Sequence, residues 1–102
     1  MKIKLWVDDV RPAPNLNYFR LTSVNNSKWY IEYCENEGIE IELIDIDHDA
    51  GIYVYQGGDY IKLLDWLEET GRNYPIRIHS MNPVGVENMR RIIQRNGWTE
   101  VF

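Results

Sequence analysis

Short apolar runs in this chain alternate with longer segments in which apolar residues recur at helical spacing. Residues 3–7 are apolar apart from one lysine, and residues 39–46 are rich in β-branched side chains and too short for a typical helix. Three further short runs, at residues 18–21, 75–78 and 98–102, also predict strands. The pattern therefore predicts five strands, the first of them buried on both faces as in a parallel sheet.

Three segments between these runs predict helices. Residues 23–37 follow an N-cap residue, Thr22 or Ser23, and end before a glycine. A second helix begins at Asp59, and a third follows Asn82, which precedes a proline suited to the first helical position. The expected buried faces consist of Val24, Ser27, Ile31 and Cys34 in the first helix, Tyr60, Leu63, Leu64 and Leu67 in the second, and Val86, Met89 and Ile93 in the third.

Strands and helices alternate along most of the chain, which predicts an α/β fold. Parallel strands joined by right-handed helical crossovers form a doubly wound sheet with helices on both faces. We therefore expect a three-layer α/β/α arrangement around a mostly parallel, five-stranded sheet. Pro12 and Pro14 exclude a regular helix between the first two strands. The length of 102 residues predicts a single domain over residues 1–102.

Composition narrows the classes of partner and the cellular compartment. The net charge of −5 argues against an extended nucleic-acid surface, although it allows a small phosphorylated ligand held through a metal ion. Cys34 is the only cysteine, so no internal disulfide forms. No apolar run approaches the roughly 18 residues of a membrane span, and Asp8 and Asp9 interrupt any secretory leader. We expect a cytoplasmic protein that does not enter a membrane.

Polar residues follow three of the predicted strands and suggest a common site. Because the carboxyl ends of parallel strands lie at one edge of a sheet, these residues are expected to converge. Clustered carboxylates repel one another unless a cation neutralises them, and oxygen ligands suit Mg²⁺ or Mn²⁺. The expected metal ligands are Asp8, Asp9, Asp47 and Asp49. Asp45 lies within a strand and is interpreted as a structural pairing residue.

The remaining polar residues of this edge suggest phosphate chemistry. The third predicted helix begins directly after Ser80, so its positive end would favour a phosphate at the same place. We expect Ser80, Asn82 and Arg11 to bind that phosphate. His79 and His48 carry the side chain that transfers protons near neutral pH, and they are the expected catalytic residues together with Asp47.

Three spaced motifs resemble those of a known family, the cyclic-phosphate processing receiver domains. They are Leu-Trp-Val-Asp-Asp-Val-Arg-Pro at 5–12, Ile-Asp-His-Asp-Ala-Gly at 46–51, and His-Ser-Met-Asn-Pro-Val-Gly with Asn88-Met89 at 79–89. The resemblance covers nearly the whole chain. It implies a receiver-like (flavodoxin-like) fold with a reduced first helix, and processing of a cyclic phosphate on a small nucleotide or at an RNA 2′,3′-cyclic phosphate end.

The chain also resembles ordinary receiver domains, which bind Mg²⁺ through an acid pair and accept a phosphoryl group on an aspartate. Asp8-Asp9, Asp47 and Ser80 match those positions, but the last lysine is Lys62, so no lysine follows the final strand. The expected function is therefore a metal-dependent phosphoesterase acting on a cyclic phosphate. Two alternatives stay open: a regulatory receiver-like module phosphorylated on Asp47, and an interaction domain that uses the aromatic helix at 23–37.

Overall fold

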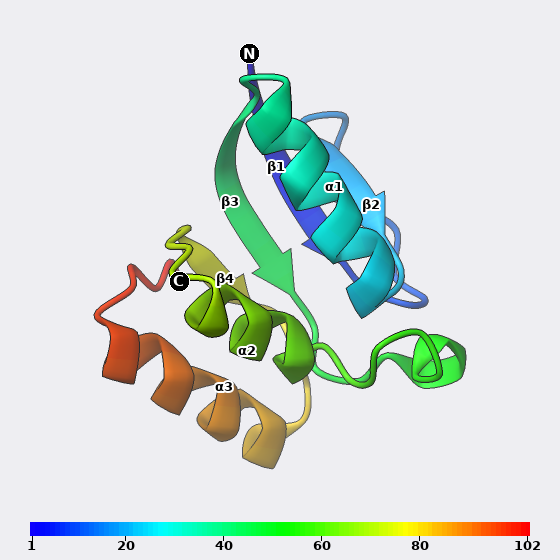
Figure 1. Cartoon of the computed structure of the whole chain (residues 1–102). Helices are drawn as coiled ribbons and strands as arrows, with labels where there is room; N and C mark the ends of the chain where they lie inside the picture. Colours follow the sequence, from blue (N-terminus) through cyan, green and yellow to red (C-terminus); the bar gives the residue numbers. More distant parts are fainter.

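A computed structural model describes all residues, 1–102, as one parallel sheet with three α-helices (Figure 1). Every neighbouring pair of strands is parallel, and the strand order is β2-β1-β3-β4. The elements are β1 (Lys2–Val7), β2 (Tyr18–Leu21), α1 (Val24–Asn36), β3 (Glu40–Ile46), the 3₁₀ helix η1 (Gly51–Tyr53), α2 (Ile61–Glu69), β4 (Ile76–Ile78) and α3 (Pro83–Asn96). None of the helices combines the length and the apolar character that crossing a membrane requires.

The predicted fifth strand at residues 98–102 is wrong, and the sheet has four strands. This segment forms a single parallel bridge, between Glu100 and Ile76. Trp98 still packs against the end of α3, because its backbone N–H donates to the carbonyl of Ile93 at 3.0 Å and its ring is buried in the core. The residues after Trp98 hydrogen-bond to β4 only through Ile76, which donates to Thr99 and accepts from Val101, so they form a bridge and not a ladder.

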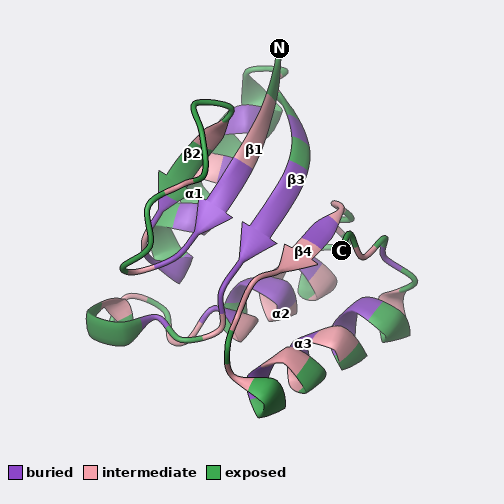
Figure 2. Ribbon diagram, turned by 180° about the vertical axis from the view of Figure 1, so that it is seen from behind, coloured by how far each residue is buried: buried purple, intermediate pink, exposed green.

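All three helices lie on one face of the sheet, so the predicted three-layer arrangement is also wrong (Figures 1 and 2). The chain steps from β2 past β1 to β3, and then to β4, in the same direction across the sheet. Right-handed crossovers in one direction place their helices on one face. The only step in the opposite direction, from β1 to β2, runs through residues 8–17, which contain no helix. The other face of the sheet therefore carries no helical layer.

The core fills the space between the sheet and the helices. The four residues predicted to be buried in α1, the four predicted for the second helix, and Met89 and Ile93 of α3 are all buried. Val86, which was also predicted on the buried face of α3, is only half-buried. From the sheet, Leu5, Val7, Ile44 and Ile46 join the same cluster. Burial of one such side chain contributes about 1.5–3 kcal/mol, so this one-sided core is the main source of stability.

Side-chain caps and a glycine set the ends of the helices. Ser23 is the N-cap of α1, where its Oγ accepts the N–H of Asn26 at 3.0 Å. Asn82 caps α3 in the same way, with Oδ1 accepting the N–H of Gly85 at 3.0 Å. Gly97 ends α3 in the left-handed conformation, with φ of 65°. These contacts confirm the predicted start of α1 and both ends of α3. The predicted start of the second helix at Asp59 is wrong: α2 begins at Ile61, because the N–H groups of Lys62 and Leu63 donate to carbonyls three residues back and form a tighter turn before the helix.

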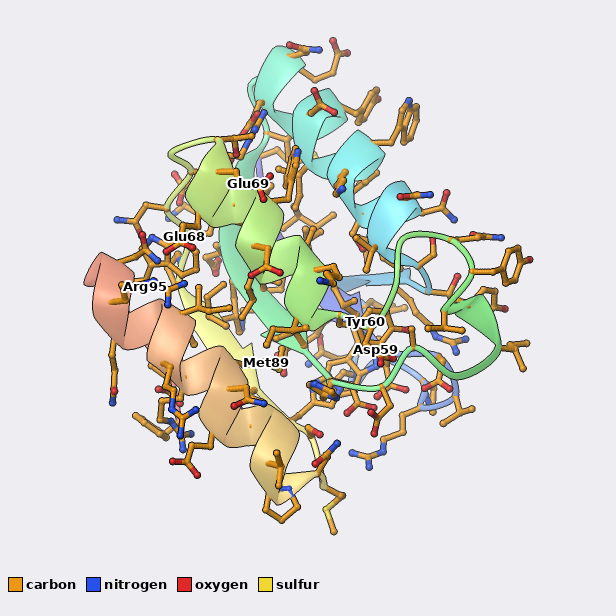
Figure 3. The ribbon with its side chains drawn as sticks, turned by 60° about the horizontal axis from the view of Figure 1, so that its bottom comes forward. Asp59, Tyr60, Glu68, Glu69, Met89 and Arg95 are labelled. Carbon is orange, nitrogen blue, oxygen red and sulfur yellow. The ribbon has the colours of Figure 1, made fainter.

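Ion pairs fasten the carboxyl-terminal ends of the helices to each other. Figure 3 shows Glu68 of α2 beside Arg95 of α3, and the two side chains form two hydrogen bonds of 2.8 Å. Glu35 of α1 accepts a bidentate pair from Arg72, whose guanidinium also lies 4.3 Å from the ring centre of Trp66. These contacts join segments far apart in the sequence.

Replacing Glu35 with Gln is expected to destabilise the protein by about 1 kcal/mol at neutral pH, the range for a well-formed but solvent-screened ion pair. The guanidinium of Arg72 and the hydroxyl of Tyr74 lower the pKa of Glu35 despite its partial burial. The stabilisation is therefore present above the pKa of an unfolded glutamate, and it is lost as the pH falls through the folded pKa. Urea unfolding at pH 7 and pH 3 checks this. A difference between the two proteins that does not become smaller between pH 7 and pH 3 would contradict it.

Candidate active site

The register of the sheet brings three candidate residues together. Trp6 pairs with Asp45, and Asp45 pairs with Arg77, so these side chains form a row across the face that lacks helices. Two positions after each of these residues comes a candidate site residue, and it lies on the same side of the sheet because side chains alternate with period two. That next row consists of Asp8, Asp47 and His79. Their potential ligand atoms all lie within 4.8 Å of one another.

Asp8 is a buried carboxylate held by several donors. Its Oδ1 accepts the N–H groups of Val10 at 2.9 Å and Arg11 at 2.8 Å, and its Oδ2 contacts Nε2 of His79 at 2.8 Å. Burial alone would raise the pKa of Asp8, but the two N–H donors and the imidazole outweigh it, and the pKa lies below its ordinary value. Asp8 is therefore ionised at neutral pH and available as a ligand.

His79 is fixed at both ring nitrogens. Nε2 contacts Asp8, and Nδ1 contacts Oδ1 of Asp45 at 2.7 Å. Its ring stacks on Trp6 with 3.9 Å between the ring centres and an angle of 1° between the planes. A neutral imidazole has one N–H, so donation to both carboxylates requires a second proton. While Asp8 occupies Nε2, His79 has no free nitrogen for a substrate.

Asp45 is part of the site, which the sequence interpretation did not include. It is fully buried and contacts His79, the hydroxyl of Tyr18 at 3.2 Å and Nη1 of Arg77 at 3.1 Å. Asp45 does form the predicted structural pair, with Arg77, but it also contacts His79, which is a site residue. The signal in the sequence was the spacing: Trp6, Asp45 and Arg77 each precede a site residue by two positions and so share its side of the strand.

Asp47 has the one carboxylate oxygen of the row without a protein partner. Its Oδ1 accepts the N–H of His48 at 2.7 Å, its Oδ2 has none, and the residue is 8% exposed.

Beneath this edge, Tyr60 is fully buried at the start of α2 (Figure 3) and donates its hydroxyl to the carbonyl of Thr22 at 2.7 Å. Burial and the charges of Asp9, Asp8 and Asp47 raise the pKa of Tyr60. The edge therefore has the negative field that a cation would neutralise.

His48 lies on the opposite side of the strand end from this cluster. Its Nδ1 contacts Oδ1 of Asp49 at 2.8 Å, and its Nε2 has no partner. The ring packs against the first turn of α3, where a Cβ on Gly85 would lie 2.5 Å from Cγ of His48. A carboxylate on Nδ1 favours the tautomer with a free electron pair on Nε2. His48 therefore has the arrangement of a general base, which His79 lacks.

The two other predicted metal ligands lie outside the close cluster. The carboxylate of Asp9 packs against the backbone of Gly51, where a Cβ would lie 2.1 Å from its Oδ2. Asp49 is directed to His48, and its side chain is 61% exposed. Only Asp8 and Asp47 of the four carboxylates join the cluster that could hold an ion. Coordination by Asp9 or Asp49 stays a prediction.

The predicted phosphate-binding residues line the neighbouring loop and helix start. Oγ of Ser80 accepts the N–H of Asn82 at 3.0 Å, which leaves the hydroxyl proton free to donate. The amide nitrogen of Asn82 lies 3.5 Å from Oδ1 of Asp49. Arg11 donates through Nη1 to the carbonyl of His79 at 3.1 Å, so the first loop is tied to the end of β4. The remaining donors of its guanidinium are available to an anion.

The donor set of this edge fits a divalent cation. Asp8 is ionised, Asp47 has a free oxygen, and both are hard oxygen ligands of the kind that Mg²⁺ and Mn²⁺ accept. Mg²⁺ sites usually consist of one or two carboxylates completed by water and substrate phosphate. The residues present are therefore sufficient.

Comparison with known proteins places the chain in a family. No curated protein and no solved structure matches it. The sequence model of the cyclic-phosphate processing receiver domain, however, matches residues 3–95, which is nearly the whole chain. The parallel sheet and the acidic cluster at its edge agree with that match. The chain belongs to the family of cyclic-phosphate processing receiver domains.

Proposed function

We propose that the protein is a metal-dependent phosphoesterase that opens a cyclic phosphate, either on a small nucleotide or at an RNA 2′,3′-cyclic phosphate end. The observation that carries this proposal is the cluster of Asp8, Asp47 and His79, whose ligand atoms lie within 4.8 Å of one another. Membership of a cyclic-phosphate processing family supports the substrate class. The cation would be Mg²⁺ or Mn²⁺, held by Asp8 and Asp47 with Asp9 and Asp49 nearby.

The cation, when bound, would polarise a phosphoryl oxygen and lower the pKa of a bound water. The residues of the chain supply the rest. Asp8 needs no deprotonation before binding, because its pKa is already lowered by the N–H groups and the imidazole that oppose its burial. Asp47 offers one carboxylate oxygen to the same cluster, and its Oδ2 has no protein partner. Ser80 and Arg11 would orient the phosphate through their free donors. Asn82, at the start of α3, would join them by giving up the long contacts of its amide nitrogen with His48 and Asp49, at 3.4 and 3.5 Å.

Proton transfer is supported best at His48. In hydrolysis, a water oxygen bonds to phosphorus and one ring P–O bond breaks, so the water loses a proton and the leaving alkoxide gains one. The free Nε2 of His48, with Asp49 on Nδ1, can accept the proton of the water. His79 was predicted for the same role, but both of its nitrogens contact carboxylates. We therefore assign the proton transfer to His48 and not to His79.

The test is phosphorus NMR of the protein with a panel of cyclic phosphates that includes 2′,3′-cyclic nucleotides. The panel is run with Mg²⁺, with Mn²⁺ and with a chelator in excess. We expect a cyclic resonance to convert into a monoester resonance only when metal is present. The two carboxylates are negative, so a cation is needed to stabilise the negative charge that develops on the phosphoryl group. The monoester that forms also shows which oxygen leaves.

A panel that stays unconverted under every metal would contradict the phosphoesterase proposal. The receiver-like alternative predicts a stable adduct of Asp47 with a phosphoryl-fluoride mimic in the presence of Mg²⁺, and no turnover. Mass spectrometry of the protein after the same incubations detects such an adduct. The two functions are thus separated in one set of samples.

A further inference from the structure

The geometry points to a nitrogen ligand in the proposed metal site: Nε2 of His79, presented to the cation by Asp45. This inference rests on the cation binding of the proposed function, but not on its turnover. It makes Asp45 a positioning residue that acts through His79. It also distinguishes the site from one built of carboxylates alone.

The position of Nε2 supports the assignment. It lies 2.8 Å from Oδ2 of Asp8 and within 4.8 Å of the ligand atom of Asp47, so the nitrogen and the two carboxylates converge on one place. The imidazole is almost completely enclosed, with 6% of its side chain exposed. A proton on Nε2 now joins His79 to Asp8. A bound cation would take the place of that proton between the same atoms.

The surroundings of His79 prevent the ring from turning away. Stacking on Trp6 fixes its plane, and Asp45 holds Nδ1 at 2.7 Å. Hydrogen bonds from Tyr18 and Arg77 hold the carboxylate of Asp45 in place, so it does not turn away from His79. Ligating histidines characteristically donate their second N–H to a carboxylate, which sets the tautomer and increases the basicity of the ligating nitrogen. Asp45 is in the position of that carboxylate.

An imidazole ligand changes the expected choice of metal. Sites made only of carboxylate and water suit Mg²⁺, whereas an imidazole favours transition metals, among which Mn²⁺ also accepts carboxylates. We expect Mn²⁺ to bind more tightly than Mg²⁺ to the unmodified protein. The preference is expected to shrink in His79→Gln, because that variant offers oxygen in place of nitrogen.

The test is pulsed electron paramagnetic resonance of the whole protein loaded with Mn²⁺, which detects a ¹⁴N nucleus bound to the metal. The chain has only two histidines, so the assignment is direct. We expect the imidazole ¹⁴N signal in the unmodified protein and in His48→Gln, and its loss in His79→Gln. Asp45→Asn is expected to weaken Mn²⁺ binding 10- to 100-fold, the range for removal of such an outer carboxylate. Asp65→Asn removes the same charge from an exposed pair with Lys62 on α2, away from the cluster, so it is the matched control and should bind Mn²⁺ like the unmodified protein.

The outcomes separate this inference from the proposed function. Mn²⁺ that binds without an imidazole ¹⁴N signal, or with a signal that persists in His79→Gln, overturns the nitrogen ligand and leaves the phosphoesterase proposal standing. Asp45→Asn that binds Mn²⁺ as tightly as Asp65→Asn overturns the role of Asp45. A folded protein that binds neither Mn²⁺ nor Mg²⁺ by calorimetry overturns both, because the cation belongs to the proposed function itself.

Discussion

Replacing Asp47 with Asn is expected to lower the turnover of a cyclic phosphate by about a thousandfold. The amide keeps the shape of the side chain and can still accept the N–H of His48, but it removes the negative charge and the free ligand oxygen. A bound metal contributes several kcal/mol to stabilisation of the transition state, and each 1.36 kcal/mol is a factor of ten, so a loss of about 4 kcal/mol gives this magnitude. Phosphorus NMR under saturating Mn²⁺ measures the rate.

The thermal unfolding midpoint of Asp47→Asn should stay close to that of the unmodified protein, since the hydrogen bond at Oδ1 survives. Asp65→Asn is the matched control for this substitution. Asp65 lies on α2 away from the cluster and forms only an exposed pair with Lys62 at 3.9 Å, so its loss should leave turnover unchanged. A folded Asp47→Asn protein that keeps the activity of the Asp65→Asn protein would remove Asp47 from the site.

Replacing Gly85 with Ala is expected to lower turnover by about 100-fold without loss of stability. The new Cβ would lie 2.5 Å from Cγ of His48, so the ring must leave its place against α3 and its contact with Asp49. A correctly placed general base contributes about 10²–10⁴-fold, and the lower end applies to a displaced ring. The helix itself gains, because alanine is more favourable than glycine in a helix by about 1 kcal/mol.

Two measurements check this prediction: the rate of ring opening, and the ¹H–¹⁵N NMR signals of the His48 ring. Val84→Ala is the control, because Val84 is in the same turn of α3 and 70% exposed, so its truncation leaves the ring in place. The His48 signals should shift in Gly85→Ala and stay in Val84→Ala. Unchanged turnover in a Gly85→Ala protein whose His48 signals have shifted would show that His48 does not transfer the proton.

Much of the fold could be predicted because its signals are local. Caps such as Ser23 and Asn82 hydrogen-bond within one turn, and Gly97 ends α3 because its backbone adopts a positive φ. The buried faces of the helices follow from spacing alone. The convergence of Asp8, Asp47 and His79 was also predictable, because parallel strands end at one edge of the sheet.

The division of that edge into two groups could not be predicted from the residue types. Asp8, Asp47 and His79 lie on the side without helices, whereas His48 packs on Gly85 of α3. Which group a residue joins depends on the register of the strand before it. The proposed assignment of proton transfer to His48 rather than to His79 follows from this, since His79 contacts carboxylates at both ring nitrogens and His48 keeps a free Nε2.

The residue pattern alone predicts the α/β class, the parallel sheet, the start of α1, both ends of α3 and the meeting of Asp8, Asp47 and His79, because each depends on short-range patterns or on a general rule of chain direction. The number of layers and strands, the start of α2 and the contact of Asp45 with His79 follow from the tertiary structure. The number of layers depends on the direction of each step from strand to strand across the sheet, and the pairing of residues 98–102 depends on where α3 ends. The proposed role of Asp45 depends on His79, a residue 34 positions away that only folding brings to a distance of 2.7 Å.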